Sequence, residues 1–504
     1  MKSLQLVSPK SRITAFIHQD WVNLWDQHFL PKWIPPILSI ILAELVALSI
    51  VRGAWYIAVP LVLLIPLGIM FLRYPYGSVM LWLLTAPFLQ TTPTTSERAL
   101  YWMVHRAMPP AVLAMIIAAS LLLPKTGYLR RLGRPELLLA PFVAIGILSI
   151  VLLQPADNVL QTLYHFYDHL FVPICLYLIV RLTSSDDIGF KYLLPIMLVV
   201  TIVQSSIGLL GLFAPEAIRS DWRAMGSARV SGTLRAPGAY TTTLVLFCFV
   251  LYHAAIQSKR RIAKFLFLSI FAFGCLMVFL SFSRGSWLGG LVAFAGLLIV
   301  YPKPTIRIIF VLSILMVLFG GGLLRDQLDW AAERLDERNN AQARIVMYDT
   351  AAKMIHSRPV FGWGYNNFKR FRDEFKGRVN NFVVNEENIG IHNTFLSIAA
   401  ELGLMGFFFY IFPMIWWLWF TVKIVPRMPR EGFWSWRLLV ILWLSILDQI
   451  VVNSFMDMTS FIYGIGIWWI TLGFIGNIVS QYLNPSDIGL PKWIYRSSAV
   501  LNSR

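Results

Sequence analysis

The stretch Ile391-His392-Asn393-Thr394-Phe395-Leu396 marks the point where a hydrophilic segment gives way to an apolar one. It is followed by Glu401-Leu402-Gly403-Leu404-Met405-Gly406, in which one carboxyl group stands among apolar and small residues. The hydrophilic segment before it, residues 325–391, separates it from eleven apolar segments upstream. The stretch therefore predicts a titratable imidazole at the place where a polar loop enters a membrane.

The composition of the whole chain is that of a membrane protein. Of its 504 residues, 57% are hydrophobic and 14% are charged, whereas soluble domains average about 25% charged residues. Apolar runs recur, each close to the roughly 20 residues that a helix needs to cross a bilayer. Because only helices and closed barrels satisfy the backbone within lipid, these runs predict an all-α polytopic membrane protein.

We count fourteen candidate transmembrane helices, or twelve if one hairpin is counted wrongly. They begin near Ile37, Tyr56, Ser78, Ala111, Leu137, Phe166, Tyr192, Ala239, Phe265, Ser286, Ile308, Thr394, Leu438 and Phe461. The loops assigned to the inner side contain 24 Lys and Arg residues, and the short outer loops contain 8. This bias predicts that both termini are cytoplasmic and that the long loop is extracytoplasmic.

The chain is accordingly divided into five parts. They are a polar, amphipathic cytoplasmic segment (1–36), transmembrane helices one to eleven (37–324), an extracytoplasmic loop domain (325–391), transmembrane helices twelve to fourteen (392–482) and a cytoplasmic tail (483–504).

The net charge of +17 does not indicate nucleic acid, because inner-loop cations that anchor the protein to membrane lipids account for most of it. Inner-loop anchoring does not explain a group of arginines predicted on the outer side, where the topology rule expects few cations. They are Arg219, Arg223, Arg229, Arg235 and Arg284. An anionic partner on that side would explain them.

The long loop has the pattern of a small ordered unit that is partly helical. Helical spacing predicts a first helix over 324–335 and a second over 342–356. A turn at 358–364 follows, and Asn366 or Asn367 is positioned to cap a third helix. Residues 379–391 are expected to be irregular. The simpler interpretation is a solvated cap on the membrane surface.

His392 is the leading candidate for chemistry, because imidazole exchanges protons near neutral pH. Asn393 supports it with a further hydrogen-bonding side chain. Glu401 lies inside the span, where an ionisable group suggests function, but helical spacing places it nearly opposite His392. The alternatives are an interfacial histidine that caps the span and a packing role for Glu401.

Three arginines are candidates for binding an anion. Arg235 lies in a Gly- and Pro-rich bend, Arg284 lies in a tight turn, and Arg344 begins the second loop helix. Guanidinium groups match phosphate oxygens, so these residues could hold a membrane-borne diphosphate. Contact with lipid headgroups is the alternative.

Other polar clusters allow less specific interpretations. His165 and His169 share a helix face and could bind a metal, but no third ligand is evident. Asp448, Asn453 and Asp457 either face the cavity of His392 or hold helices together. The three cysteines fall inside spans and form no zinc-type cluster.

Four stretches in this order resemble the O-antigen ligase and polymerase superfamily, whose fold is of the GT-C glycosyltransferase kind. They are residues 283–287, Arg344 through 359–364, His392 to Leu396 with Glu401, Gly403 and Gly406, and residues 453–457. The resemblance implies transfer of a glycan from an undecaprenyl diphosphate carrier to an acceptor hydroxyl outside the cytoplasmic membrane, without metal or other cofactor.

By matching position, His392 looks like the family's essential loop histidine, and Arg235 and Arg284 look like its diphosphate-binding arginines. The resemblance also implies a role in O-antigen, exopolysaccharide or capsule synthesis, with inversion at the anomeric carbon. The acceptor would be a saccharide, lipid or protein, and polysaccharide export or flippase proteins would be further partners. A polymerase is favoured over a ligase, because nothing identifies a lipid A-core acceptor.

The alternative function is a polytopic transporter or a flippase for lipid-linked oligosaccharides. Transporters commonly show internal repeats and interrupted helices in matched halves, and neither is evident in the sequence. His392, Arg235 and Arg284 are instead expected to converge on one cavity.

Overall fold

The computed structural model describes residues 74–90, 94–122, 132–183, 187–223, 229–323, 339–377 and 390–483, together with isolated positions before residue 74. The chain divides into two compact units, Met1–Ile69 and Met70–Arg504. Every element discussed below belongs to the second unit. The helices predicted near Ile37 and Tyr56, and the one predicted over 324–335, lie outside the described residues.

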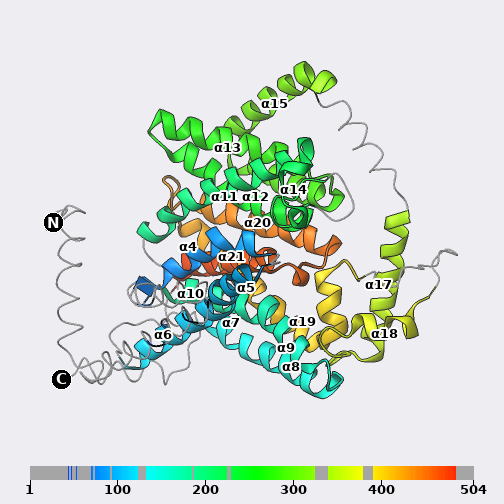
Figure 1. Cartoon of the computed structure of the whole chain (residues 1–504). Coiled ribbons are helices and arrows are strands. Elements are labelled where there is room, and N and C mark those ends of the chain that lie inside the picture. The colour runs from blue at the N-terminus through cyan, green and yellow to red at the C-terminus, as the bar shows by residue number, and fades with distance from the viewer. Residues whose placement is uncertain are drawn as a thin grey trace, which may run out of the picture. The chain divides into compact units, whose positions relative to one another are not determined.

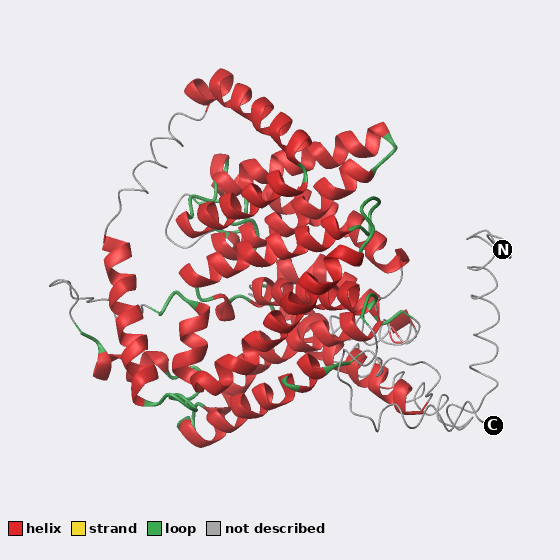
Figure 2. Ribbon diagram, turned by 180° about the vertical axis from the view of Figure 1, so that it is seen from behind, coloured by secondary structure: helices red, strands yellow, loops and turns green. Residues whose placement is uncertain are grey.

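The described part of the chain consists of helices and loops and contains no strand (Figures 1 and 2). The helices are α4 (Tyr76–Thr85), α5 (Thr95–Tyr101), α6 (Met108–Leu122), α7 (Arg134–Leu137), α8 (Leu139–Leu153), α9 (Val159–Phe166), α10 (Val172–Thr183), α11 (Asp187–Phe213), α12 (Pro237–Gln257), α13 (Arg261–Phe279), α14 (Arg284–Val300), α15 (Pro302–Leu323), α17 (Asn339–Ser357), α18 (Phe368–Phe375), α19 (Thr394–Ile424), α20 (Trp436–Phe455) and α21 (Ile462–Ser480).

Among the described residues, nine helices are long and apolar enough to cross a membrane, and two shorter apolar helices accompany them. Each span predicted from Ser78 onward coincides with one of the helices. The prediction of an all-α polytopic membrane protein is therefore confirmed. The orientation and the exact number of spans stay predictions.

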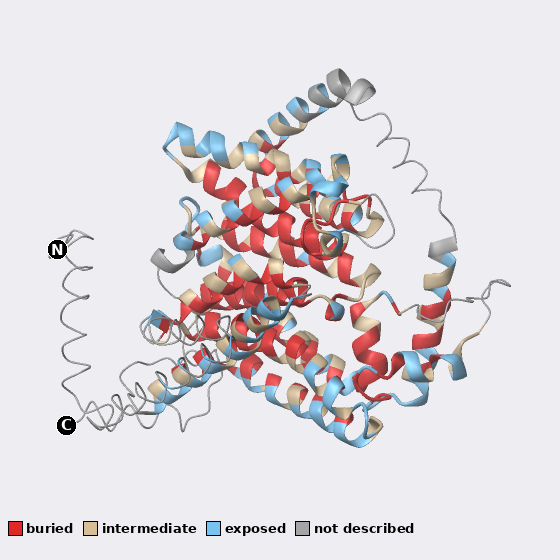
Figure 3. Ribbon diagram, viewed as in Figure 1, coloured by how far each residue is buried: buried red, intermediate tan, exposed pale blue. Residues whose placement is uncertain are grey.

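The middle of the bundle is formed by α12 and α21, whose side chains are almost all buried (Figure 3). Two glycines of α21 allow its neighbours to approach closely. A Cβ atom on Gly466 would lie 2.2 Å from the Trp82 ring of α4, and one on Gly473 would lie 3.0 Å from Val180 of α10. Small residues at helix contacts are the usual means of close packing between membrane helices.

Arg181 is buried inside the bundle, although the sequence suggests an inner-loop cation. Its guanidinium donates to Glu136 Oε1 at 2.7 Å and to Asn477 Oδ1 at 2.8 Å. The Trp417 ring lies 4.6 Å from its Cζ atom. A buried charge persists only when it is paired and hydrogen-bonded, so Arg181 joins α7, α10, α19 and α21 instead of facing the headgroups.

The two described helices of the loop domain, α17 and α18, lie beside the beginning of α19 (Figure 1). Both were predicted from the sequence within a few residues of their observed bounds. A hydrophobic cluster joins them to α19 through buried Val346, Met347, Trp363, Phe368 and Ala400. This packing fixes the position of the loop domain at the end of the bundle where α19 begins.

Candidate functional site

The turn between α17 and α18 is joined to α19 by backbone hydrogen bonds. α19 bends at Gly403, whose φ is +69° and ψ is −179°, and the bend leaves backbone groups of residues 400–405 without helical partners. The turn at 359–364 supplies them. The bonds run from Trp363 to Ala400, from Gly364 to Glu401, from Leu404 to Pro359 and from Met405 to Val360, over 2.7–3.2 Å. Because kinks free backbone groups that must be satisfied again, turn and helix depend on each other.

Replacement of Gly403 by alanine is expected to destabilise the protein by at least about 2 kcal/mol, since a left-handed backbone costs a non-glycine residue about 1–3 kcal/mol. The added Cβ atom would also lie 2.2 Å from the Val360 carbonyl oxygen. The thermal midpoint of the purified protein in detergent measures the effect. Gly290→Ala is the control, because its Cβ atom would meet only Val278, at 3.5 Å. Equal midpoints for the two variants would contradict the proposed coupling.

Glu401 positions the first turn of α18. Its carboxylate accepts hydrogen bonds from the amides of Asn366 at 2.8 Å and Phe368 at 3.1 Å. A carboxylate at a helix N-terminus accepts hydrogen bonds from backbone amides that have no partner within the helix. Its negative charge is also stabilised by the helix dipole. The packing role considered for Glu401 is therefore present, and its side chain also lines a cavity.

Three arginines from separate segments meet in a narrow recess. Arg229 precedes α12, Arg284 is the first residue of α14, and Arg344 lies in the first turns of α17; all three line a space of about 60 Å³. Phe455 and Met456, at the end of α20, form part of its wall. We call this space the basic recess. The Nε atom of Arg229 is buried and has no hydrogen-bond acceptor within the described part of the chain.

A larger cavity, of about 480 Å³, adjoins the basic recess. Met456 lines both spaces, so they share a wall. The larger one, which we call the main cavity, is lined by His392 and by polar or aromatic side chains from the loop domain, α9, α19 and the segment between α20 and α21. Those are His165, Tyr365, Asn366, Phe368, Lys369, Ser397, Glu401, Asp457, Thr459, Ser460 and Phe461.

His392 lines the main cavity, and the residue is exposed. Its backbone carbonyl accepts a hydrogen bond from the Tyr348 hydroxyl at 3.4 Å. Desolvation by the cavity wall, followed by the charges of Arg344 and Lys369, lowers the pKa of the imidazole below its usual value. The ring therefore stays neutral, and able to accept a proton, at a lower pH than an ordinary histidine.

Residues with a strained backbone gather around these two spaces. Within the described part of the chain, the non-glycine residues with positive φ are Arg235, Phe282, Asn366 and His392, at +61°, +48°, +61° and +52°. Phe282 lines the basic recess, and Asn366 and His392 line the main cavity. Each non-glycine residue in a left-handed conformation costs about 1–3 kcal/mol of folding free energy, and such strain clusters at functional sites. The backbone conformation therefore indicates that this region is a functional site, independently of the chemistry of its side chains.

Three polar residues predicted near His392 hold the segments that meet there. Asn393 caps α19, because its Oδ1 accepts from the Leu396 amide at 3.0 Å, and its Nδ2 donates to the Ser454 carbonyl at 3.1 Å. Asp457 lines the main cavity and accepts hydrogen bonds from the amide and hydroxyl of Thr459 at 3.1 and 2.6 Å. Asn453 acts between helices, since its Oδ1 accepts from the Thr394 hydroxyl at 2.7 Å.

The structure does not place His392, Arg284 and Arg235 on the lining of one cavity. Arg284 and Arg344 line the basic recess, His392 lines the adjoining main cavity, and Arg235 lines neither. Arg235 lies three residues before Gly238, which does line the recess. Arg229 lines the recess, where Arg235 was expected. The sequence indicated Arg229 only as one of the arginines predicted on the outer side.

Helical spacing predicts that Glu401 faces away from His392, yet both line the main cavity. The prediction assumed that both residues belong to one helix. His392 precedes the helix, which begins at Thr394, and its left-handed backbone redirects the side chain.

His165 and Lys369 also line the main cavity without having been assigned to it from the sequence. His165 stacks on His169 with 4.2 Å between ring centroids. In the described ranges, no group of three or more His, Cys, Asp or Glu residues is arranged to hold a metal ion.

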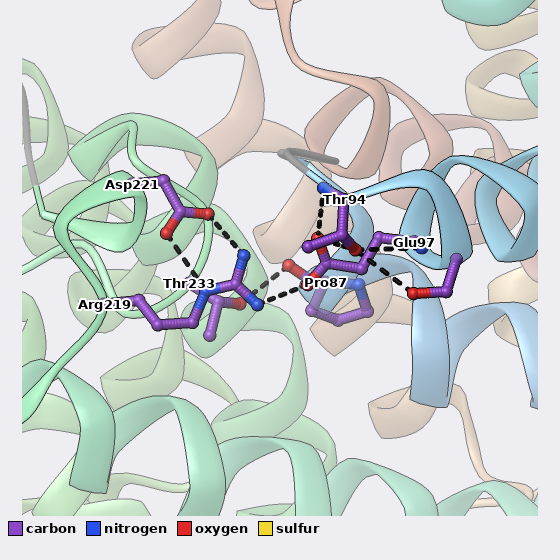
Figure 4. A network of polar contacts seen from close by, with 7 residues as sticks. Pro87, Thr94, Glu97, Arg219, Asp221 and Thr233 are labelled. Atoms are coloured by element: carbon purple, nitrogen blue, oxygen red, sulfur yellow. Dashed lines mark hydrogen bonds and ion pairs between the residues drawn. The ribbon is translucent and has the colours of Figure 1, made fainter.

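Arg219, one of the arginines that suggested an anionic partner, is paired within the protein (Figure 4). Its guanidinium contacts Glu97 at the start of α5 and donates to Asp221 at 3.0 and 2.9 Å. Beside it, Thr233 donates to the Pro87 carbonyl at 2.7 Å. Partly exposed pairs contribute about 0–1 kcal/mol each, so this network aligns the loop before α12 more than it stabilises the fold.

Residues 269–411 match the family model for O-antigen ligase. The matched segment contains Arg284, Arg344 and His392 together with the turn and bend that position them. The match confirms the predicted resemblance to the O-antigen ligase and polymerase superfamily. No curated protein matches the chain.

Proposed function

We propose that this chain is a membrane glycosyltransferase of the GT-C kind, because residues 269–411 match the family model for O-antigen ligase. It transfers a glycan from an undecaprenyl diphosphate carrier to an acceptor hydroxyl, in the synthesis of a surface polysaccharide. The observation that carries the proposal is the adjacency of the two spaces: three arginines line the basic recess, and His392 lines the main cavity across the shared Met456.

The diphosphate of the donor would occupy the basic recess. Arg229, Arg284 and Arg344 come from three segments that the fold holds in place, so their charges are arranged before the reaction begins. Negative charge develops on the diphosphate oxygen as its bond to the sugar breaks, and fixed cations in a site shielded from water stabilise that charge. Arg235, which follows Arg229 in the same loop, would contact phosphate oxygens of the diphosphate that extend beyond the recess.

His392 would accept the proton of the acceptor hydroxyl. In the proposed step, the hydroxyl oxygen forms a bond to the anomeric carbon, and the bond from that carbon to the diphosphate oxygen breaks. The electron pair of the broken bond stays on the diphosphate, and the hydroxyl proton passes to His392 and then to water. A single displacement of this kind inverts the anomeric carbon. The lowered pKa of His392 keeps the ring neutral and ready to accept the proton.

Polymerisation is the favoured form of this reaction, and ligation to a lipid or protein anchor is the other. Product analysis after deletion of the gene separates them. Loss of a polymerase leaves single repeat units on the carrier, whereas loss of a ligase leaves long polymer on the carrier. Unchanged surface polysaccharide and no accumulated carrier-linked glycan would contradict both forms.

The proposal places the active site on the extracytoplasmic face of the cytoplasmic membrane and both termini in the cytoplasm. Single cysteines at His356 in α17 and at Arg427 beyond α19, in a cysteine-free background, test the sidedness. A membrane-impermeant thiol reagent added to intact spheroplasts should label the first and not the second, because both native side chains are exposed and lie on opposite sides in the proposed topology.

The rate of glycan transfer is expected to rise with pH along an acidic limb whose midpoint lies below about 6.5, the ordinary pKa of histidine. The sign follows because the base acts when neutral, and the pKa of His392 is lowered. Lys369→Gln removes one of the charges that lower it, so the midpoint should move to higher pH. The profile of kcat/KM for donor measures it.

Lys353→Gln is the matched control, since Lys353 is exposed on α17 and pairs with Asp349 at 2.6 Å. Its profile should coincide with that of the unmodified protein. A midpoint that moves to lower pH in Lys369→Gln would contradict the assignment of His392 as the base.

A further inference from the structure

We propose that the main cavity is the acceptor-saccharide subsite, and that His165 and Tyr365 bind hydroxyl groups of the acceptor there. The inference rests on the proposed function and goes beyond it, because it assigns the acceptor a place and a chemical class. His165 lies in α9, outside the segment that matches the family.

The volumes of the two spaces indicate which part of the substrates each of them can hold. The basic recess, at about 60 Å³, has room for a group the size of a few water molecules, since one water needs about 10–15 Å³ of such volume. One phosphate group of the diphosphate is of this size, with the other at the mouth of the recess, and a sugar ring is larger. The main cavity, at about 480 Å³, lies in the range of about 300–1,000 Å³ that is usual for small-molecule sites.

The charges of the two linings also differ. Guanidinium groups dominate the recess, whereas the main cavity presents the carboxyl groups of Glu401 and Asp457 beside a single ammonium group, that of Lys369. Carboxyl groups bind hydroxyl groups in either protonation state, but they offer no cation to a phosphate. The occupant of the main cavity is therefore expected to be an uncharged polyol.

The remaining lining fits a saccharide. The hydroxyl-bearing residues Ser397, Thr459 and Ser460 line the same space as the aromatic residues Tyr365 and Phe461. A sugar ring carries hydroxyl groups at its edges and apolar C–H groups on its faces, so it needs both kinds of contact. Sites of this kind combine apolar walls with a few fixed polar groups.

His165 and Tyr365 are held rigidly for such a task. The His165 Nδ1 atom and the Tyr365 hydroxyl are hydrogen-bonded at 2.9 Å, and the ring of His165 stacks on His169. The Tyr365 backbone is fixed by Gln154, whose Nε2 donates to its carbonyl at 2.6 Å, and by Ser149, whose hydroxyl accepts from its amide at 3.2 Å. Binding groups placed in advance lose little entropy when ligand arrives.

The positions of His165 and Tyr365 indicate that they contact the acceptor and not the donor sugar. The donor sugar is covalently attached to the diphosphate, so it must lie where the main cavity meets the recess, beside Met456. His165 and Tyr365 line the main cavity and do not line the recess. His165 and Tyr365 are therefore placed to contact the acceptor while the diphosphate occupies the recess and the first donor sugar lies beside Met456.

Transfer kinetics of the full-length protein in liposomes test the proposal. The donor is the lipid-linked repeat unit extracted from host cells, and the acceptor is an oligosaccharide released from the host polysaccharide by partial acid hydrolysis. The variants are Tyr365→Phe, which removes one hydroxyl group, and His165→Phe, which keeps an aromatic ring against His169. Each should raise the acceptor KM about tenfold, the effect of one lost hydrogen bond, with the donor KM unchanged.

Tyr164→Phe is the matched control, because Tyr164 is the exposed neighbour of His165, and its acceptor KM should not change. An unchanged acceptor KM in both test variants, or a rise in the donor KM alone, overturns the assignment of the subsite. If Arg284→Ala still abolishes transfer in that case, the proposed function stands without this subsite. If neither Arg284→Ala nor His392→Ala affects transfer, the proposed function itself fails.

Discussion

Replacement of His392 by alanine is expected to lower the rate of glycan transfer by about 10²- to 10⁴-fold, the usual contribution of a positioned general base. No other imidazole of the described residues combines a place on the main cavity with proximity to Arg344 of the recess. His165, the other imidazole on the lining, is already hydrogen-bonded to Tyr365. It is therefore not expected to replace His392, and little activity should remain.

A second variant separates chemistry from folding. The φ of His392 is +52°, and asparagine adopts that conformation more readily than most residues, so His392→Asn keeps the turn while it removes the imidazole. Both variants should insert into membranes, purify and melt as the unmodified protein does. His356→Ala, on the exposed face of α17, should keep full activity. Full transfer by a folded His392→Asn protein would contradict the role of the ring as the base.

Replacement of Arg284 by alanine is expected to lower kcat/KM for the donor by about 10²- to 10³-fold, the cost of removing one fixed group that stabilises developing charge. Arg284 begins α14 with its side chain in the basic recess, so the helix N-terminus adds to the attraction for an anion. Arg344→Ala should have an effect in the same range. The double variant should lose less than the sum, because both residues act on one diphosphate.

Lysine at position 284 should restore part of the activity, since it keeps the charge but loses the planar fork of donors. Arg427→Ala is the control, because Arg427 is exposed and lies just after the C-terminal end of α19, whereas His392 lies just before its N-terminal end. If Arg284→Ala changes only the KM for the acceptor, the recess does not bind the donor diphosphate.

The helices follow from local sequence patterns, and the structure agrees with them. Apolar runs predict the spans from Ser78 onward, and spacing within the loop predicts α17 to within a few residues. Asn367 does precede α18, but its amide group donates to the Trp363 carbonyl at 3.0 Å, and the backbone amide of Phe368 is instead satisfied by Glu401. The position of the helix was readable from the sequence, and the residue that holds its start was not.

The arrangement of the site depends on contacts between segments that are distant in the chain, and one sequence does not reveal these. Spacing could not choose between Arg229 and Arg235, since both lie in the same loop and only the path of the chain places Arg229 on the recess. His165 meets Tyr365 across 200 residues. The position of Glu401 beside His392 was missed because helical geometry was extended past the first residue of α19.

The most direct test of the account is the stoichiometry of transfer by the purified, reconstituted protein. With lipid-linked glycan as donor and host oligosaccharide as acceptor, we expect one carrier diphosphate to be released for each glycosidic bond formed, and neither product with His392→Asn. Carrier release without bond formation, or equal transfer by the unmodified protein and that variant, would contradict the claim that the recess and the cavity together form one transferase site.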